Sequence, residues 1–147
     1  SLGVLFEESP GDPLTTAEAN ALVESFRIYR DADSNGVFDP ALDVLVTWVP
    51  TLPLTNGIAT VVLPDGDPNL QIALGSPRTY FLVVELTANA STQAPNQLRL
   101  THLGLGPSAS VAEDRSFDIP LRLACPVDVS SSIKQAVPVE LLGFKVE

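Results

Sequence analysis

Short apolar runs rich in Val, Ile, Leu and Thr are broken along this chain by Pro and Gly. Thirteen Pro and nine Gly are spread over 147 residues at fairly regular intervals. This punctuation is typical of a sandwich or a barrel of antiparallel strands, and it disfavours alternating helices and strands. The sequence therefore predicts an all-β fold. Its length suits one domain over residues 1–147.

We expect strands wherever an apolar, β-branched run lies between turn residues. The expected strands are residues 3–8, 25–30, 44–49, 58–63, 70–74, 80–88, 97–103, 121–129 and 137–146. One segment departs from this pattern. Thr15 and Glu18 form a capping-box sequence, and good helix formers follow them, so a short helix is expected over residues 16–24. Asp65-Gly66 predicts a tight turn, and Asp65 and Asp67 fit turn residues better than ligands.

The charge of the chain limits its partners. Eight Lys and Arg against eighteen Asp and Glu give a formal net charge of −10, so a nucleic-acid backbone or an anionic membrane is not expected as a partner.

No apolar run approaches the ~20 residues that cross a bilayer, and we expect a soluble protein without membrane insertion. The chain has no Met and opens on a strand-like segment, which suggests excision or processing from a longer polypeptide.

The most specific chemical feature is the acidic segment from Asp31 to Asp43. Oxygen-bearing side chains occupy its positions one, three, five, nine and thirteen, with Gly36 at position six and Val37 where a backbone carbonyl ligand is usual. Hard oxygen donors and several carboxylates suit Ca²⁺. The sequence therefore predicts a calcium site with ligands from Asp31, Asp33, Asn35, Val37, Asp39 and Asp43.

This segment differs from an EF-hand loop in two ways. Leu42 stands at position twelve, where a bidentate Glu is usual, and predicted strands rather than helices flank the loop. We therefore expect a calcium-braced connection between strands. The alternative is a solvated Asp-rich turn, because Asp, Asn and Gly favour turns without any metal. Repulsion favours the ion: two carboxylates ~4 Å apart cost on the order of 4 kcal/mol at an effective dielectric near 20.

The loop and its surroundings resemble modules repeated in large bacterial extracellular and cell-surface proteins. There, a Tyr-Arg-Asp strand end, here Tyr29 to Asp31, leads into an Asp-x-Asp-x-Asn-Gly-x-x-Asp loop. Residues 65–69, 77–87 and 112–121 are also similar to that repeat. The resemblance implies an immunoglobulin-like or fibronectin-like antiparallel sandwich that serves as a spacer, adhesin or scaffold part. It also implies a secreted or cell-surface setting in bacteria, with neighbouring protein modules or subunits as partners.

Catalytic chemistry is not expected. The chain has one His, one Cys and no Gly-x-Ser-x-Gly elbow, so a nucleophile with its base and orienting group is not recognisable. His102 fits a structural or partly exposed position, Cys125 fits a buried strand position, and Trp48 fits the core better than a sugar platform. Glu113, Asp114 and Asp118 form either a solvated loop or a second metal site.

Two non-enzymatic functions remain open at this stage. The first is a calcium-binding structural or adhesion module. The second is a subunit of an extracellular filament that lends a terminal strand, residues 1–8 or 137–147, to the sheet of a neighbour.

Overall fold

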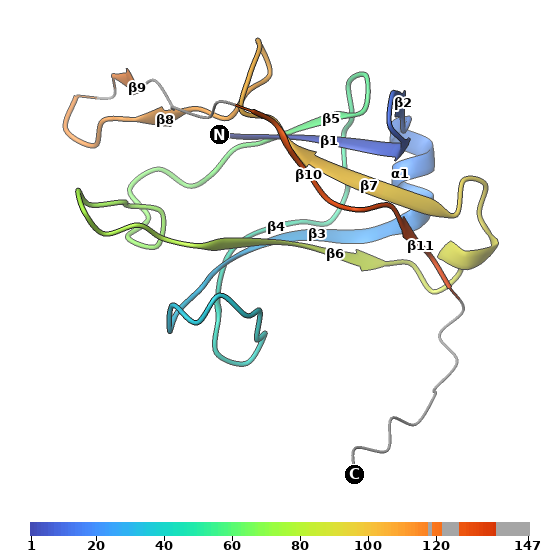
Figure 1. Cartoon of the computed structure of the whole chain (residues 1–147), viewed down its shortest axis with the longest axis horizontal. Coiled ribbons are helices and arrows are strands. Elements are labelled where there is room, and N and C mark those ends of the chain that lie inside the picture. Colours follow the sequence, from blue (N-terminus) through green and yellow to red (C-terminus); the bar gives the residue numbers. More distant parts are fainter. Residues whose placement is uncertain (118, 122–126, 138–147) are drawn as a thin grey trace.

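The computed structural model describes residues 1–117, 119–121 and 127–137 of the chain (Figure 1). Antiparallel sheets dominate these residues and one short α-helix accompanies them, which confirms the all-β, sandwich-like fold class. Figure 1 shows two main layers that lie face to face, with the helix at one end between them. No helix in the described residues has the length and apolar character of a membrane span.

The larger sheet has six strands built around β1 and β7. β2 and β5 pair with successive halves of β1, and β10 and β11 pair with successive parts of β7. All these pairings are antiparallel. The strands are β1 (Leu2–Ser9), β2 (Asp12–Pro13), β5 (Ile58–Val61), β7 (Gln97–His102), β10 (Val129–Ser130) and β11 (Lys134–Gln135).

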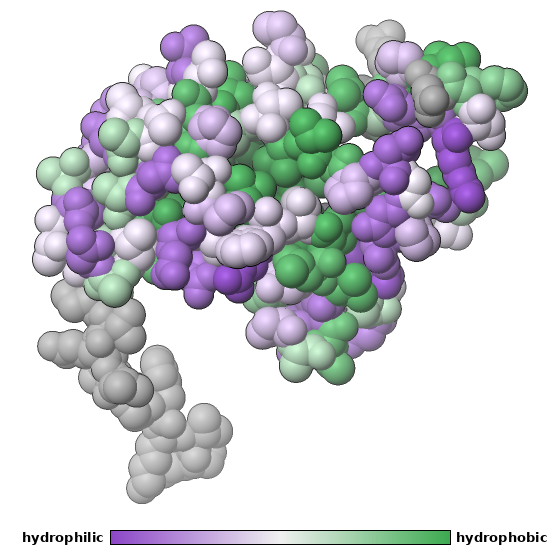
Figure 2. Space-filling view, turned by 180° about the vertical axis from the view of Figure 1, so that it is seen from behind, coloured by the Kyte–Doolittle hydropathy of each residue, from purple (hydrophilic) through white to green (hydrophobic). Residues whose placement is uncertain are grey.

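The smaller sheet has three strands in the order β4-β3-β6, with β3 (Val23–Arg30) between β4 (Val44–Val49) and β6 (Tyr80–Leu86). A separate two-stranded hairpin pairs β8 (Ala112–Glu113) with β9 (Pro120–Leu121). In Figure 2 this hairpin lies in the part that projects at the upper right, where apolar side chains are exposed. Phe117, between its two strands, is 74% exposed.

The core lies between the two main sheets. Phe6 of β1 and Phe26 of β3 are fully buried, and their rings meet edge to face with centroids 5.6 Å apart. This geometry is a preferred one for aromatic pairs, because the positive ring edge faces the negative ring face. Val4 and Ile28 occupy the same inner faces two residues away, as the period of a strand requires.

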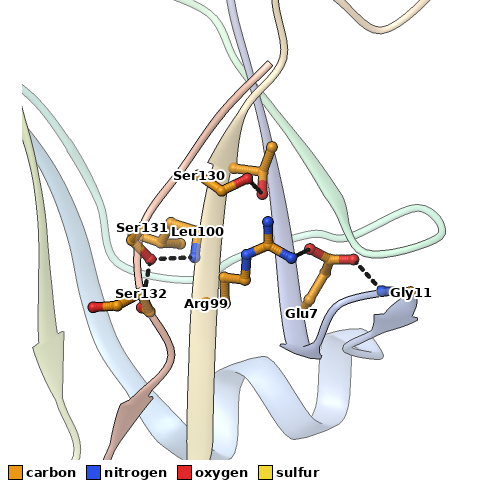
Figure 3. Close-up of polar contacts among 8 residues, drawn as sticks. Glu7, Gly11, Arg99, Leu100, Ser130, Ser131 and Ser132 are labelled. Atoms are coloured by element: carbon orange, nitrogen blue, oxygen red, sulfur yellow. Dashed lines mark hydrogen bonds and ion pairs between the residues drawn. The ribbon is translucent and has the colours of Figure 1, made fainter. Parts of the chain in front are cut away.

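A buried ion pair ties β1 to β7 in the larger sheet (Figure 3). Glu7 is 6% exposed, and its Oε2 lies 3.4 Å from Nη1 of Arg99. Its Oε1 accepts a hydrogen bond from the backbone N–H of Gly11 at 2.8 Å. Both carboxylate oxygens therefore have partners, which a buried charge needs if it is not to destabilise the fold.

The helix α1 (Thr16–Leu22) is held at its start by the predicted capping box. The hydroxyl of Thr15 accepts from the backbone N–H of Glu18, whose carboxylate accepts from the backbone N–H of Thr15 at 2.8 Å. These bonds from the Thr15 backbone and hydroxyl lower the pKa of Glu18. The helix ends two residues earlier than predicted, because Val23 adopts an extended conformation and starts β3.

Two sequence predictions about local structure are wrong. Residues 70–74 form no strand, because Asp67 directs the chain into a turn: its carboxylate accepts from the backbone N–H of Asn69 and its carbonyl from that of Leu70. Trp48 is 57% exposed instead of buried. The β3–β4 register shifts between Ile28 and Tyr29, and such an irregularity changes which residues of β4 face the core.

The other predicted strands match in position, with small differences at their ends. Of the predicted strand 121–129, the structure describes Leu121 in β9, Val129 in β10 and the irregular residues 127–128, and Cys125 lies outside the described residues. Of the predicted strand 137–146, the structure describes only Val137, which is exposed and outside any strand.

The capping box generates a stability prediction. Thr15→Ala removes the side-chain acceptor of the first helical turn, so the free energy of unfolding should fall by about 1 kcal/mol. Chemical denaturation followed by circular dichroism measures this. Thr51→Ala, at an exposed position outside the helix, is the control and should leave the midpoint nearly unchanged. Equal midpoints for the two variants would contradict the role of the cap.

Candidate metal site

The acidic loop connects β3 to β4 at one edge of the molecule (Figure 1). Arg30, the last residue of β3, pairs with Val44, the first residue of β4. Asp31 and Asp43 directly follow and precede these two residues, so strand pairing brings the first and last acids of the loop together. Strand pairing thereby fixes the position of the site without the help of a ligand.

Asp31 organises the first half of the loop. Its side chain is only 4% exposed. One carboxylate oxygen accepts from the backbone N–H of Ser34 at 2.7 Å, and the other accepts from that of Gly36 at 2.9 Å. Ser34 and Gly36 both have positive φ angles, of 60° and 73°. The left-handed conformation, which Gly adopts without strain, turns the chain back toward Asp31.

Asp43 organises the second half in the same way. It is 8% exposed, and its two oxygens accept from the backbone N–H groups of Ala32, at 3.1 Å, and Asp39, at 2.8 Å. The two carboxylates at the ends of the loop thus hold four backbone N–H groups between them. Charge-assisted bonds of this kind are roughly twice as strong as neutral ones, and they keep the loop folded against the sheet.

Asp33 brings a third carboxylate to the same place. One oxygen each from Asp31, Asp33 and Asp43 lie within 4.8 Å of one another, and no other such group occurs among the described residues. Asp33 is exposed, so the cluster opens to solvent on one side. Three negative charges at this separation repel each other, whereas one divalent ion would attract all three. Carboxylate oxygens at such spacing fit the ligand chemistry of Ca²⁺.

The other predicted ligands lie around this cluster with different partners. The amide of Asn35 donates to Oδ2 of Asp33 at 2.8 Å, so it touches the cluster through that carboxylate. Val37 is 66% exposed, and its N–H donates to the side chain of Asn35. Asp39 accepts from the backbone N–H of Ala41 and is not one of the three grouped acids. The three carboxylates are therefore the part of the predicted ligand set that the structure brings together.

Phe38 anchors the acidic loop, which the sequence pattern did not reveal. It lies in the acidic loop, and its ring meets that of Tyr29 in β3 edge to face, with centroids 4.9 Å apart. The ring of Phe81 in β6, the cross-strand partner of Tyr29, is 5.7 Å from that of Phe38. The loop is therefore anchored by an apolar contact to two strands of the smaller sheet. The only sequence signal was a single aromatic residue in a loop rich in acids.

A second loop supports the first. The backbone N–H of Asp31 donates to the carbonyl of Thr79 at 3.0 Å. Arg30 donates through Nε to the side chain of Asn69 at 3.2 Å, and the hydroxyl of Tyr80 donates to the Asn69 carbonyl at 2.8 Å. The segment between β5 and β6 thus holds the end of β3 from which the site begins.

Asp114 and the single His have structural contacts. The Asp114 carboxylate accepts from the backbone N–H groups of Ser116 and Phe117 in the turn of the β8–β9 hairpin. Glu113 lies in β8, and Asp118 lies outside the described residues. His102, in β7, is bonded through Nε2 to the buried Ser110 hydroxyl at 2.9 Å.

Opposing effects act on the ionisation of Asp31. Its burial disfavours the charged form, but the hydrogen bonds from the backbone N–H groups of Gly36 and Ser34 favour it. Together with the backbone of Asn35, these bonds hold the pKa of Asp31 below its ordinary value of 3.8. Asp31 therefore stays ionised at neutral pH, as a cation ligand must.

Comparison with protein-family models, with curated proteins and with solved structures gave no significant match for this chain.

The contacts of Phe38 generate a prediction. Phe38→Ala removes both aromatic contacts, each worth roughly 0.5–1.5 kcal/mol beyond buried area, so the free energy of unfolding should fall by about 1–3 kcal/mol. Phe117→Ala makes the same change at an exposed ring and should have little effect. Denaturant midpoints measure both. A Phe38→Ala protein as stable as Phe117→Ala would show that the loop is not anchored through its ring.

The lowered pKa of Asp31 generates a second prediction. A group whose pKa is lowered by folding contributes stability above its unfolded pKa, and this contribution is lost as pH falls through the folded value. Acidification below about pH 4 should therefore destabilise the wild type. Asp31→Asn should be less stable at neutral pH but should lose less on acidification, as thermal unfolding at several pH values would show. Parallel pH profiles for the two proteins would contradict the assignment.

Proposed function

We propose that this chain is a non-catalytic β-sandwich module whose acidic loop binds Ca²⁺ and thereby braces the connection between β3 and β4. The observation that carries the proposal is the convergence of Asp31, Asp33 and Asp43 within 4.8 Å. Hydrogen bonds from the backbone offset the hydration that Asp31 and Asp43 lose on burial. They do not remove the electrostatic repulsion among the three carboxylates. A dication relieves that repulsion and adds bonds of its own.

Calcium is favoured over the other common cations by the donors of the loop. The neighbouring groups are carboxylates, an amide side chain and backbone carbonyls, which are hard oxygen donors. Zinc prefers His and Cys ligands, and none lies among residues 31–43. Magnesium demands near-ideal octahedral geometry and keeps several waters, whereas calcium tolerates irregular coordination. A loop already fixed by four backbone hydrogen bonds at Asp31 and Asp43 suits the more tolerant ion.

The role of the ion in this proposal is structural. The loop joins neighbouring strands of one sheet, and Phe38 fixes it to Tyr29 and Phe81. Ion binding therefore stabilises one arrangement instead of opening a groove, as sensor EF-hands do. A module of this kind suits a secreted or surface-attached bacterial protein, where free calcium is abundant enough to occupy weak sites. Neighbouring modules or subunits are the proposed partners.

The proposal generates a direct test by thermal unfolding. After chelation and dialysis, added Ca²⁺ should raise the unfolding temperature, because a ligand that binds only the folded state stabilises it. At a calcium concentration a hundredfold above Kd the gain is about 2.7 kcal/mol, or roughly 5 to 10 °C for a chain of this size. Asp33→Ala should remove most of the shift, since Asp33 is the exposed member of the cluster.

The control is Asp65→Ala, which removes an exposed turn carboxylate outside the acidic loop and should leave the calcium shift intact. Unfolding temperatures of the wild type that are equal in calcium and in excess chelator would refute the proposal. A shift that survives in Asp33→Ala would place the ion elsewhere.

A further inference from the structure

The acidic loop contains a reactive dipeptide, Asn35-Gly36, and a second one, Asn56-Gly57, lies in the turn before β5. In an Asn-Gly pair, the backbone nitrogen of Gly can attack the side-chain carbonyl carbon of Asn, because Gly has no Cβ to hinder the approach. A bond forms between this nitrogen and carbon, and ammonia leaves. Water then opens the cyclic imide to Asp or to isoaspartate, in which the main chain runs through the side chain.

Both reacting groups of Asn35-Gly36 are held by hydrogen bonds. The attacking nitrogen of Gly36 donates its proton to Oδ2 of Asp31 at 2.9 Å. The side chain of Asn35 is fixed at both ends: its amide donates to Asp33 at 2.8 Å, and its carbonyl accepts from Val37 at 2.6 Å. The nitrogen must lose its proton to attack, and the adjacent buried carboxylate disfavours a negative charge there.

We propose that Asn35 is a latent site of spontaneous deamidation, which the Asp31 carboxylate keeps unreactive while the acidic loop is folded. Opening the loop frees the nitrogen of Gly36 and the side chain of Asn35 at the same time. The only co-reactant is water.

Without a bound cation, the product would disfavour reclosure of the loop. Conversion to Asp places a fourth carboxylate beside Asp31, Asp33 and Asp43. Conversion to isoaspartate lengthens the main chain by one carbon between positions 35 and 36, which moves the nitrogen of Gly36 away from Asp31. Both products weaken the contacts that protected Asn35, so the modification records that the loop has opened.

The test follows deamidation of the full chain in mildly alkaline buffer, with each site located by peptide fragmentation in mass spectrometry. In the native wild type, Asn35 should convert at least about tenfold more slowly than in denaturant, the size expected from one charge-assisted bond. Asp31→Ala, checked for folding by circular dichroism, should raise the rate at Asn35 by a similar factor. Asn56 in the same molecules is the internal reference, and its rate should not change between the wild type and the folded variants.

Asp33→Ala provides a second variant, because it frees the amide of Asn35 and leaves Asp31 in place. Its rate at Asn35 should lie between those of the wild type and Asp31→Ala. Equal rates at Asn35 in native and denatured wild type would overturn the proposal. So would folded variants in which Asn35 reacts no faster than in the wild type.

Discussion

The buried carboxylate of Asp31 is the constraint on which the acidic loop depends. A charged group that is 4% exposed destabilises a protein unless hydrogen bonds replace its lost hydration. Ser34 and Gly36 supply those bonds through their backbone N–H groups, and this requirement sets the curl of the chain. Asp43 repeats the arrangement at the other end of the loop. Once both acids are fixed in this way, Asp33 is brought beside them, and the resulting concentration of negative charge is what a cation would bind.

The sheet makes this arrangement possible at a low entropic cost. Pairing of Arg30 with Val44 already closes the loop, and the ring of Phe38 fixes its middle to β3 and β6. A ligand that binds a preordered loop does not have to restrict backbone motion at the moment of binding. The same fixed loop explains why we infer slow deamidation at Asn35. The hydrogen bond from the backbone N–H of Gly36 to Asp31 shapes the loop and also keeps that nitrogen from attacking the side chain of Asn35.

Much of the fold follows from local sequence signals. Apolar runs between Pro and Gly predicted the main strands, and the spacing of Thr15 and Glu18 predicted the start of the helix. The failures have tertiary causes. Trp48 is exposed because the β3–β4 register shifts, and residues 70–74 are not a strand because Asp67 forms a turn just before them. At the site, the spacing of acids predicted the cluster of Asp31, Asp33 and Asp43. The spacing of acids could not show the contacts of Phe38, because these depend on how the loop folds back on β3 and on the pairing of β3 with β6.

The most direct measurement is a crystal structure of the protein grown with calcium, with anomalous scattering used to identify the ion. We expect one calcium ion whose distances to oxygens of Asp31, Asp33 and Asp43 fall in the usual range of about 2.3–2.6 Å, with Phe38 still packed on Tyr29 and Phe81. A loop with the same backbone hydrogen bonds, and with only water between the three carboxylates at saturating calcium, would contradict this expectation.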